Sequence, residues 1–150
     1  MKILLCRSNT IGSWAIRILT WSPWSHAVLI NRDDAVEATW PRVQQTTAAK
    51  VIAKHSAYTF VDLPCWSPDL AWKAAQSQIG QPYDWTALVG FLFHRDWEKA
   101  GSWFCSELVA WSFAQGGTPL FRPDVAKRIT PYDLWLLPPV EGFDGSKSMT

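Results

Sequence analysis

The sequence predicts one domain that mixes strands and helices. Apolar strands open the chain, a polar turn joins two further strands, and helices with clear start and stop signals dominate the second half. The chain has 150 residues and no internal linker, so one core is expected. We therefore treat residues 1–150 as a single domain.

The first third of the chain carries the clearest strand signals. Residues 2–7 are predicted to form a buried strand, and Asn9-Thr10 can cap a helix that Pro23 ends. Residues 25–30 and 35–40 then form two strands on either side of a polar turn. This pair is the clearest hairpin in the sequence.

The length of the hairpin turn decides which side chains share a face. Side chains alternate between the two faces of a strand, so a loop of two or of four residues places Glu37 on the same face as His26. A loop of odd length would put them on opposite faces. With an even loop the two side chains can cooperate.

The remaining elements are predicted from capping residues, prolines and glycines at their ends. They are a helix at 48–54, a strand at 58–63, a helix opened by Ser67-Pro68-Asp69 and closed by Gly80, a helix at 85–93 capped by Asp84, and helices at 106–115 and 131–136. The polar tail at 141–150 is expected to fray.

Charge and hydropathy limit the classes of partner. Lys and Arg together number 14 and Asp and Glu 13, so there is no basic field for nucleic acid or anionic lipid. No stretch approaches the roughly 20 apolar residues of a membrane helix, and the apolar start stops at Arg7, too early for a signal peptide. We expect no nucleic-acid partner, no transmembrane segment, no export signal, and a cytoplasmic location in the producing cell.

Cysteine and tryptophan are the informative residue types. The three cysteines, Cys6, Cys65 and Cys105, include no metal-like C-x-x-C pair, and their odd number leaves at least one thiol free, which fits a reducing compartment. Eleven tryptophans is an unusual number. We expect most of them in the core, although an aromatic groove for a sugar or an acyl chain would also use them.

Cys105 stands where a helix should begin. Residues 106–115 contain no proline or glycine, and Gly116-Gly117 supplies a stop, so Cys105 lies in the first turn. There the unpaired N–H groups and the positive end of the helix dipole favour a nucleophilic thiolate. The alternative is a small buried apolar residue, the commonest role of a free cysteine.

A nucleophilic cysteine needs a base, and His26 is the best candidate. It begins a strand between small residues, and Glu37 on the neighbouring strand can orient its ring by accepting a hydrogen bond. The competing candidates are His55 and His94, which lie in more polar sequence. Spacing alone therefore offers a Cys-His-Glu site as one hypothesis beside the structural interpretation of Cys105.

Five motifs follow one another along residues 22–137. They are Trp24-Ser25-His26-Ala27-Val28, Val36-Glu37-Ala38, Gly80-Gln81-Pro82-Tyr83-Asp84-Trp85, Phe104-Cys105-Ser106-Glu107-Leu108-Val109 and Ile129-Thr130-Pro131-Tyr132-Asp133-Leu134. Their order resembles the circularly permuted branch of the NlpC-type papain-like superfamily. That branch includes the YiiX- and YaeF-like cysteine hydrolases and, more remotely, the lecithin retinol acyltransferases, and its histidine strand precedes its cysteine helix.

The resemblance implies an α+β fold, a permuted papain-like core in which a small antiparallel sheet packs against the helix that bears the cysteine. It implies Cys105 as nucleophile, His26 as general base and Glu37 as the third, polar residue. Tyr83 resembles the family tyrosine that lines the substrate site and helps to hold the oxyanion; packing with a satisfied hydroxyl is an equal alternative.

The resemblance also implies a function. We expect a cysteine peptidase or amidase that forms an acyl-enzyme, uses no metal or organic cofactor, and cleaves peptidoglycan stem-peptide amides, with Trp24 and Trp103 joining Tyr83 in substrate binding. Small proteins of this type are often encoded by phages, which would suit a lysis or tail-associated role. The alternatives are a lipid acyltransferase or esterase that uses the same Cys-His site, and a catalytically silent structural or binding module.

Overall fold

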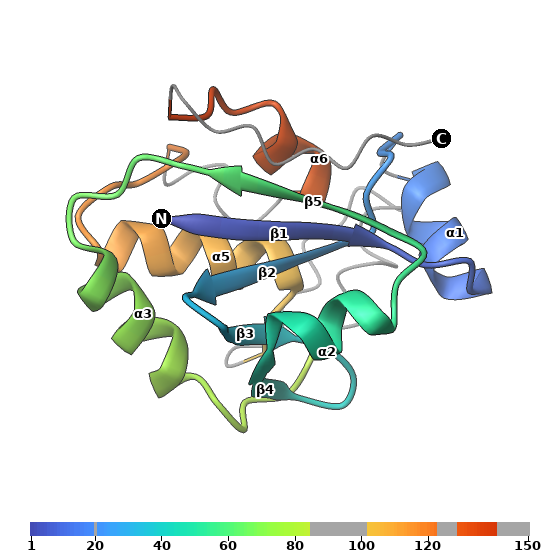
Figure 1. Ribbon diagram of the computed structural model, residues 1–150, viewed down its shortest axis with the longest axis horizontal. Coiled ribbons are helices and arrows are strands. Elements are labelled where there is room, and N and C mark those ends of the chain that lie inside the picture. Colours follow the sequence, from blue (N-terminus) through green and yellow to red (C-terminus); the bar gives the residue numbers. More distant parts are fainter. Residues whose placement is uncertain (20, 85–101, 123–128, 141–150) are drawn as a thin grey trace.

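The computed structural model describes residues 1–19, 21–84, 102–122 and 129–140, and it forms a five-stranded sheet in the order β4-β3-β2-β1-β5 (Figure 1). Every neighbouring pair is antiparallel. The strands are β1 (Lys2–Arg7), β2 (His26–Asn31), β3 (Asp34–Ala38), β4 (Val43–Thr47) and β5 (Ala57–Asp62). The helices are α1 (Ile11–Leu19), α2 (Ala48–Ala53), α3 (Pro68–Ser77), α5 (Cys105–Gln115) and α6 (Pro131–Trp135). The predicted α+β class is confirmed.

The sheet separates two apolar layers. Leu5 and Leu29 belong to the layer that includes the buried side chains of α3 and α5, whereas Leu4 and Val28 belong to the layer that contains Val51 of α2. This follows from the alternation of side chains along a strand. The helix that begins with Cys105 therefore packs against the sheet, as the resemblance implied.

The β2–β3 hairpin has the shorter of the two predicted even loops. Asn31 pairs with Asp34, which leaves Arg32 and Asp33 as the turn, and Arg32 takes a positive φ of 55°. Because side chains alternate, this register puts Glu37 on the face of His26. The conditional prediction that the two residues share a face is confirmed.

Strand β4 was not predicted. Its sequence, VQQTT, is mostly polar and lacks the alternation of apolar residues that identifies a half-buried strand. It forms because it completes the sheet beside β3, where Glu37 pairs with Gln44. The missed strand therefore supplies a residue next to the site.

Most predicted helix boundaries are confirmed to within a few residues. Ser67 occupies the N-cap position of α3, but its side chain makes no capping hydrogen bond, and α3 ends at Ser77 ahead of Gly80. At α6, Thr130 accepts from the Asp133 N–H, as expected of a capping residue. The helix predicted at 85–93 and the tail at 141–150 lie outside the described residues.

The close approach of α3 and α5 depends on one glycine. A Cβ on Gly116 would lie 2.9 Å from the Ala71 Cβ and 2.9 Å from the Ser67 carbonyl oxygen. Such contacts are too short for any side chain, so only glycine fits at the end of α5. This contact fixes the helix that carries Cys105.

The expectation that most tryptophans are buried is wrong for the described residues. Trp24 and Trp72 are buried, but five others are exposed. These are Trp14, Trp21, Trp40, Trp66 and Trp135. The number of tryptophans in a sequence does not show where they lie, because packing is decided by the face on which each one falls.

No helix in the described part of the chain is long and apolar enough to cross a membrane.

Candidate functional site

Cys105 is the first residue of α5 and is 1% exposed. The preceding residue, Phe104, has no side-chain acceptor to cap the helix, and its backbone N–H donates instead to Glu107 Oε2 at 3.2 Å. The first turn of a helix has N–H groups without helical partners and the positive end of the dipole. The sulfur therefore sits where a negative charge is favoured.

His26, the first residue of β2, lies between Cys105 and the Glu37 carboxylate. Its Nε2 lies 2.7 Å from Glu37 Oε2, and Cys105 is close enough to help raise its pKa. Because Nε2 faces Glu37, Nδ1 is the ring nitrogen left for Cys105. The other Glu37 oxygen accepts from Gln44 Nε2 at 2.8 Å. The structure thus brings together the three residues predicted to be catalytic.

The charges of the site support one another. Burial lowers the pKa of His26, but its hydrogen bonds to Cys105 and Glu37 outweigh that effect and raise the pKa to about 10. Burial raises the pKa of Glu37, yet the bond to His26, its positive charge and the bond from Gln44 bring the pKa below its ordinary value. Near neutral pH the site holds an imidazolium beside an ionised carboxylate.

His55, the competing histidine, lies against His26. The two ring centroids are 5.6 Å apart, with planes 10° from parallel. His55 Nδ1 is 2.7 Å from the Val51 carbonyl oxygen, at the end of α2. His55 is therefore a neighbour of His26 and not a substitute for it, while His94 lies outside the described residues.

Tyr83 and Trp103 lie on segments that pair side by side. The Trp103 N–H donates to the Pro82 carbonyl at 3.0 Å, and the Asp84 N–H donates to the Trp103 carbonyl at 2.9 Å. The Tyr83 ring packs 6.1 Å from the Phe104 ring. Burial, then the negative charge of Cys105, holds the pKa of Tyr83 well above its usual range. The charge of Cys105 therefore acts on Tyr83, and the Tyr83 hydroxyl stays protonated near neutral pH.

The two predicted substrate-binding tryptophans lie in different surroundings. Trp103 is half-buried, its ring lies 5.0 Å from that of Trp111 with the two planes tilted by 48°, and it donates from Nε1 to Gln78 Oε1 at 3.0 Å. Trp24 is 4% exposed and its ring meets that of Trp135 edge to face at 5.7 Å. The roles of both tryptophans in substrate binding remain predictions.

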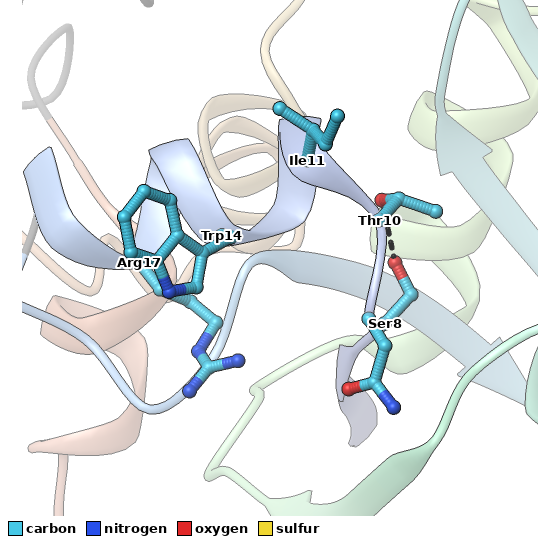
Figure 2. A pocket seen from close by; sticks show the side chains of 6 residues that line it. Ser8, Thr10, Ile11, Trp14 and Arg17 are labelled. Atoms are coloured by element: carbon cyan, nitrogen blue, oxygen red, sulfur yellow. Dashed lines mark hydrogen bonds between the residues drawn. The ribbon is translucent and has the colours of Figure 1, made fainter.

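The pocket drawn in Figure 2 lies outside this group of residues. It measures about 390 Å³ and is lined by Ser8, Asn9, Thr10, Ile11, Trp14 and Arg17. Figure 2 shows the Trp14 and Arg17 side chains on one side and the Ser8 and Thr10 hydroxyls, 3.0 Å apart, on the other. Neither Cys105 nor His26 lines it.

The cysteines of this protein are free thiols and belong to no candidate metal site in the described residues. The described ranges contain no group of three or more His, Cys, Asp or Glu side chains that could hold a metal ion. Cys6, Cys65 and Cys105 are all free thiols. Burial raises the pKa of both Cys6 and Cys65, and in Cys6 the charges of Glu37 and Cys105 raise it further.

Comparisons with known proteins support the fold. No family model matches the sequence, and no curated protein is similar enough to match it. The structure is similar to the crystal structure of the metalloprotein YiiX from Escherichia coli O157:H7, described as DUF1105, with a TM-score of 0.61 and 22% identity. The similarity covers 81% of this chain and 68% of that chain. This likeness supports a YiiX-like fold.

Sequence reasoning missed one residue of the site and set another aside. Gln44 was missed because its strand was missed, and the only available signal was its distance of seven residues from Glu37. His55 was set aside because its sequence neighbours are polar, although a histidine just after a short helix can return to the sheet. Gln44 contacts Glu37, and His55 contacts His26. The fold produces both contacts, and no pattern in the sequence indicates them.

Proposed function

We propose that this protein is a cysteine hydrolase that cleaves an amide through an acyl-enzyme on Cys105. One observation supports the proposal above all: His26 is hydrogen-bonded to the Glu37 carboxylate, and Cys105 at the start of α5 lies near enough to help raise the pKa of the same imidazole. A nucleophile, a proton carrier and an orienting acceptor in this order are what acyl transfer requires.

In the first half of the proposed reaction, the Cys105 thiolate attacks the carbonyl carbon and a C–S bond forms. The His26 imidazolium gives its Nδ1 proton to the leaving nitrogen as the C–N bond breaks, and the amine departs. In the second half, neutral His26 takes a proton from water, whose oxygen attacks the acyl carbon. The C–S bond then breaks, the acid leaves, and the thiolate and imidazolium are restored.

Two sources of hydrogen bonds are proposed to stabilise the oxyanion. The first is the Tyr83 hydroxyl, whose raised pKa keeps it protonated and able to donate. The second is the backbone N–H groups at the start of α5. Because Cys105 is 1% exposed, side chains around it must move before a substrate carbonyl can reach the sulfur.

The substrate class we propose is the stem-peptide amide of peptidoglycan, on the basis of the family resemblance. Lipid esters are the alternative for the same covalent chemistry.

Digestion of purified cell-wall sacculi tests the proposal. The wild-type protein and a Cys6→Ala control should release new amino groups, whereas Cys105→Ala should release none. Cleavage of a lipid ester without release from sacculi would favour the esterase alternative. If neither substrate turns over and a thiol-reactive activity probe leaves Cys105 unmodified, the silent-module alternative replaces the proposal.

A further inference from the structure

His55 brings a second imidazole to the site. The centroids of the His55 and His26 rings are 5.6 Å apart, and the ring planes are 10° from parallel. His55 therefore stacks on one face of the proposed base. His26 already has polar partners in Glu37 and Cys105. The stack therefore adds no hydrogen bond to His26, and its effect must be on the position and charge of the ring.

The orientation of His55 is fixed from its other side. Its Nδ1 lies 2.7 Å from the Val51 carbonyl oxygen, so Nδ1 carries the donated hydrogen, and its backbone N–H donates to the Ile52 carbonyl at 3.1 Å. The next residue, Ser56, donates from its backbone N–H to the Arg7 carbonyl of β1 at 2.9 Å. His55 is thus held between α2 and β1 and has little freedom to turn away from His26.

The charge of His55 decides whether this stack attracts or repels. A neutral ring can lie against an imidazolium, whereas two cations at this distance repel each other. Burial lowers the pKa of His55, the Val51 carbonyl opposes that effect, and the positive charge of His26 lowers it further. The other charged groups acting on it are Glu37 of β3, which raises the pKa, and Lys54 beside it in sequence, which lowers it.

Two thiols from other elements complete these surroundings. Cys6 of β1 pairs with His26 across the sheet, and Cys105 at the start of α5 helps to raise the pKa of His26. Cys6 stays a neutral thiol because burial and nearby negative charge raise its pKa. Among the described residues, the positive charge that stacks on the His55 ring is that of His26.

We propose that His55 is a positioning residue for His26: its neutral ring holds the His26 imidazolium between Cys105 and Glu37, and protonation of His55 releases that hold. The inference rests on the proposed function, because it concerns how His26 serves Cys105. It predicts that the rate of Cys105 alkylation falls at acidic pH partly because His55 gains a proton.

The test is the rate of Cys105 alkylation by iodoacetamide from about pH 4 to about pH 9. His55→Ala should lower the rate near neutral pH about tenfold, because the His26 ring loses its support. His55→Phe keeps a ring but cannot titrate, so its rate should stay within about threefold of wild type and its acid limit should move to lower pH. Tyr58→Ala is the matched control: it removes a ring that packs on Phe60 near α2 and should change neither rate nor profile.

A second measurement separates positioning from simple packing. In an NMR titration, the pKa of His55 should rise in His26→Gln, because the neighbouring positive charge is gone. Circular dichroism checks folding, and if His55→Ala does not fold, the profile of His55→Phe decides.

Wild-type rates and profiles in the His55 variants would overturn the inference and leave the proposed function intact. A wild-type protein in which Cys105 is not labelled ahead of Cys65 would instead contradict the proposed function itself.

Discussion

Cys6 and Cys105 are two buried thiols beside the same imidazole, and they differ in the backbone that carries them. They are 0% and 1% exposed, so burial does not distinguish them. Cys6 lies in a strand directly opposite His26, and its carbonyl accepts from the Ser25 N–H at 3.0 Å. Cys105 starts a helix, where N–H groups lack helical partners, and it helps to raise the pKa of His26.

The electrostatic surroundings of the two thiols follow from this difference. Negative charge on Glu37 and Cys105 adds to burial in raising the pKa of Cys6, so ionising it would place a further anion in an already negative site. Cys105 has the helix start and the imidazolium to balance its charge. The comparison teaches that two equally buried thiols can have different electrostatic surroundings, because the position of each on the backbone decides which groups face it.

The most direct way to break this comparison is to rank the three thiols by reactivity. With iodoacetamide at about pH 6, Cys105 should be alkylated on the order of 1000-fold faster than Cys6 and about 100-fold faster than Cys65, because of the three thiols only Cys105 combines a helix start with a neighbouring imidazole. Peptide mass mapping over time gives the three rates. Labelling of Cys65 first, or equal rates at Cys6 and Cys105, would contradict the activated-thiol hypothesis.

Removing the His26 imidazole should reduce the difference in alkylation rate between Cys6 and Cys105. In His26→Ala, alkylation of Cys105 at about pH 6 should fall on the order of 100-fold and recover only at alkaline pH, because the thiolate has lost its cation. The rates of Cys6 and Cys65 serve as internal controls and should change little. Unchanged labelling of Cys105 in His26→Ala would contradict the proposed role of His26 as its base.

Removing the carboxylate should have a smaller effect. Glu37→Gln keeps the shape of the side chain but loses the charge that orients His26, so turnover should fall about tenfold, far less than in Cys105→Ala. Gln44→Ala, which removes only the donor to the other Glu37 oxygen, should cost about threefold or less. Steady-state assays on one substrate would measure both, and a larger loss for Gln44→Ala than for Glu37→Gln would reverse their order.

The hairpin and the cysteine helix could be predicted from sequence because their signals are local. Alternation and turn length put Glu37 on the face of His26, and the stop at Gly116 placed Cys105 in the first turn of α5. The pairing of His26 with Cys105 was implied by the family resemblance instead. Their distance in sequence gives no local pattern that would bring them together.

The parts that sequence reasoning missed depend on contacts between distant segments. The polar strand β4 forms only because β3 offers it a partner, and Gln44 came with it. His55 reaches His26 because α2 turns the chain back toward β1, where Ser56 is anchored to Arg7. The exposure of Trp14 on α1 likewise depends on which helix face the rest of the protein covers.

The smallest effect we predict is on stability at acidic pH. It reports the contribution of the Glu37 carboxylate to folding, independently of any catalytic activity. The folded pKa of Glu37 is lowered, so in the window below its ordinary value the unfolded chain binds a proton before the folded protein does. The stability that Glu37 contributes is therefore full above its ordinary pKa of about 4.5 and is lost as the pH falls through the lower folded value. His26 has the opposite dependence, with its contribution full below about 6.5 and lost as the pH rises toward about 10.

Urea unfolding of wild type and Glu37→Gln, from about pH 6 down to about pH 3, measures this difference. Wild type should lose more stability than the variant across that window, because only wild type has at position 37 a carboxylate whose pKa is lower in the folded protein than in the unfolded chain. All other carboxylates are common to both proteins, so their contributions cancel in the difference. Parallel acid profiles for the two proteins would mean that the Glu37 carboxylate gains nothing from His26 and Gln44 in the folded state, and the ion pair at the base of the site would then have to be abandoned.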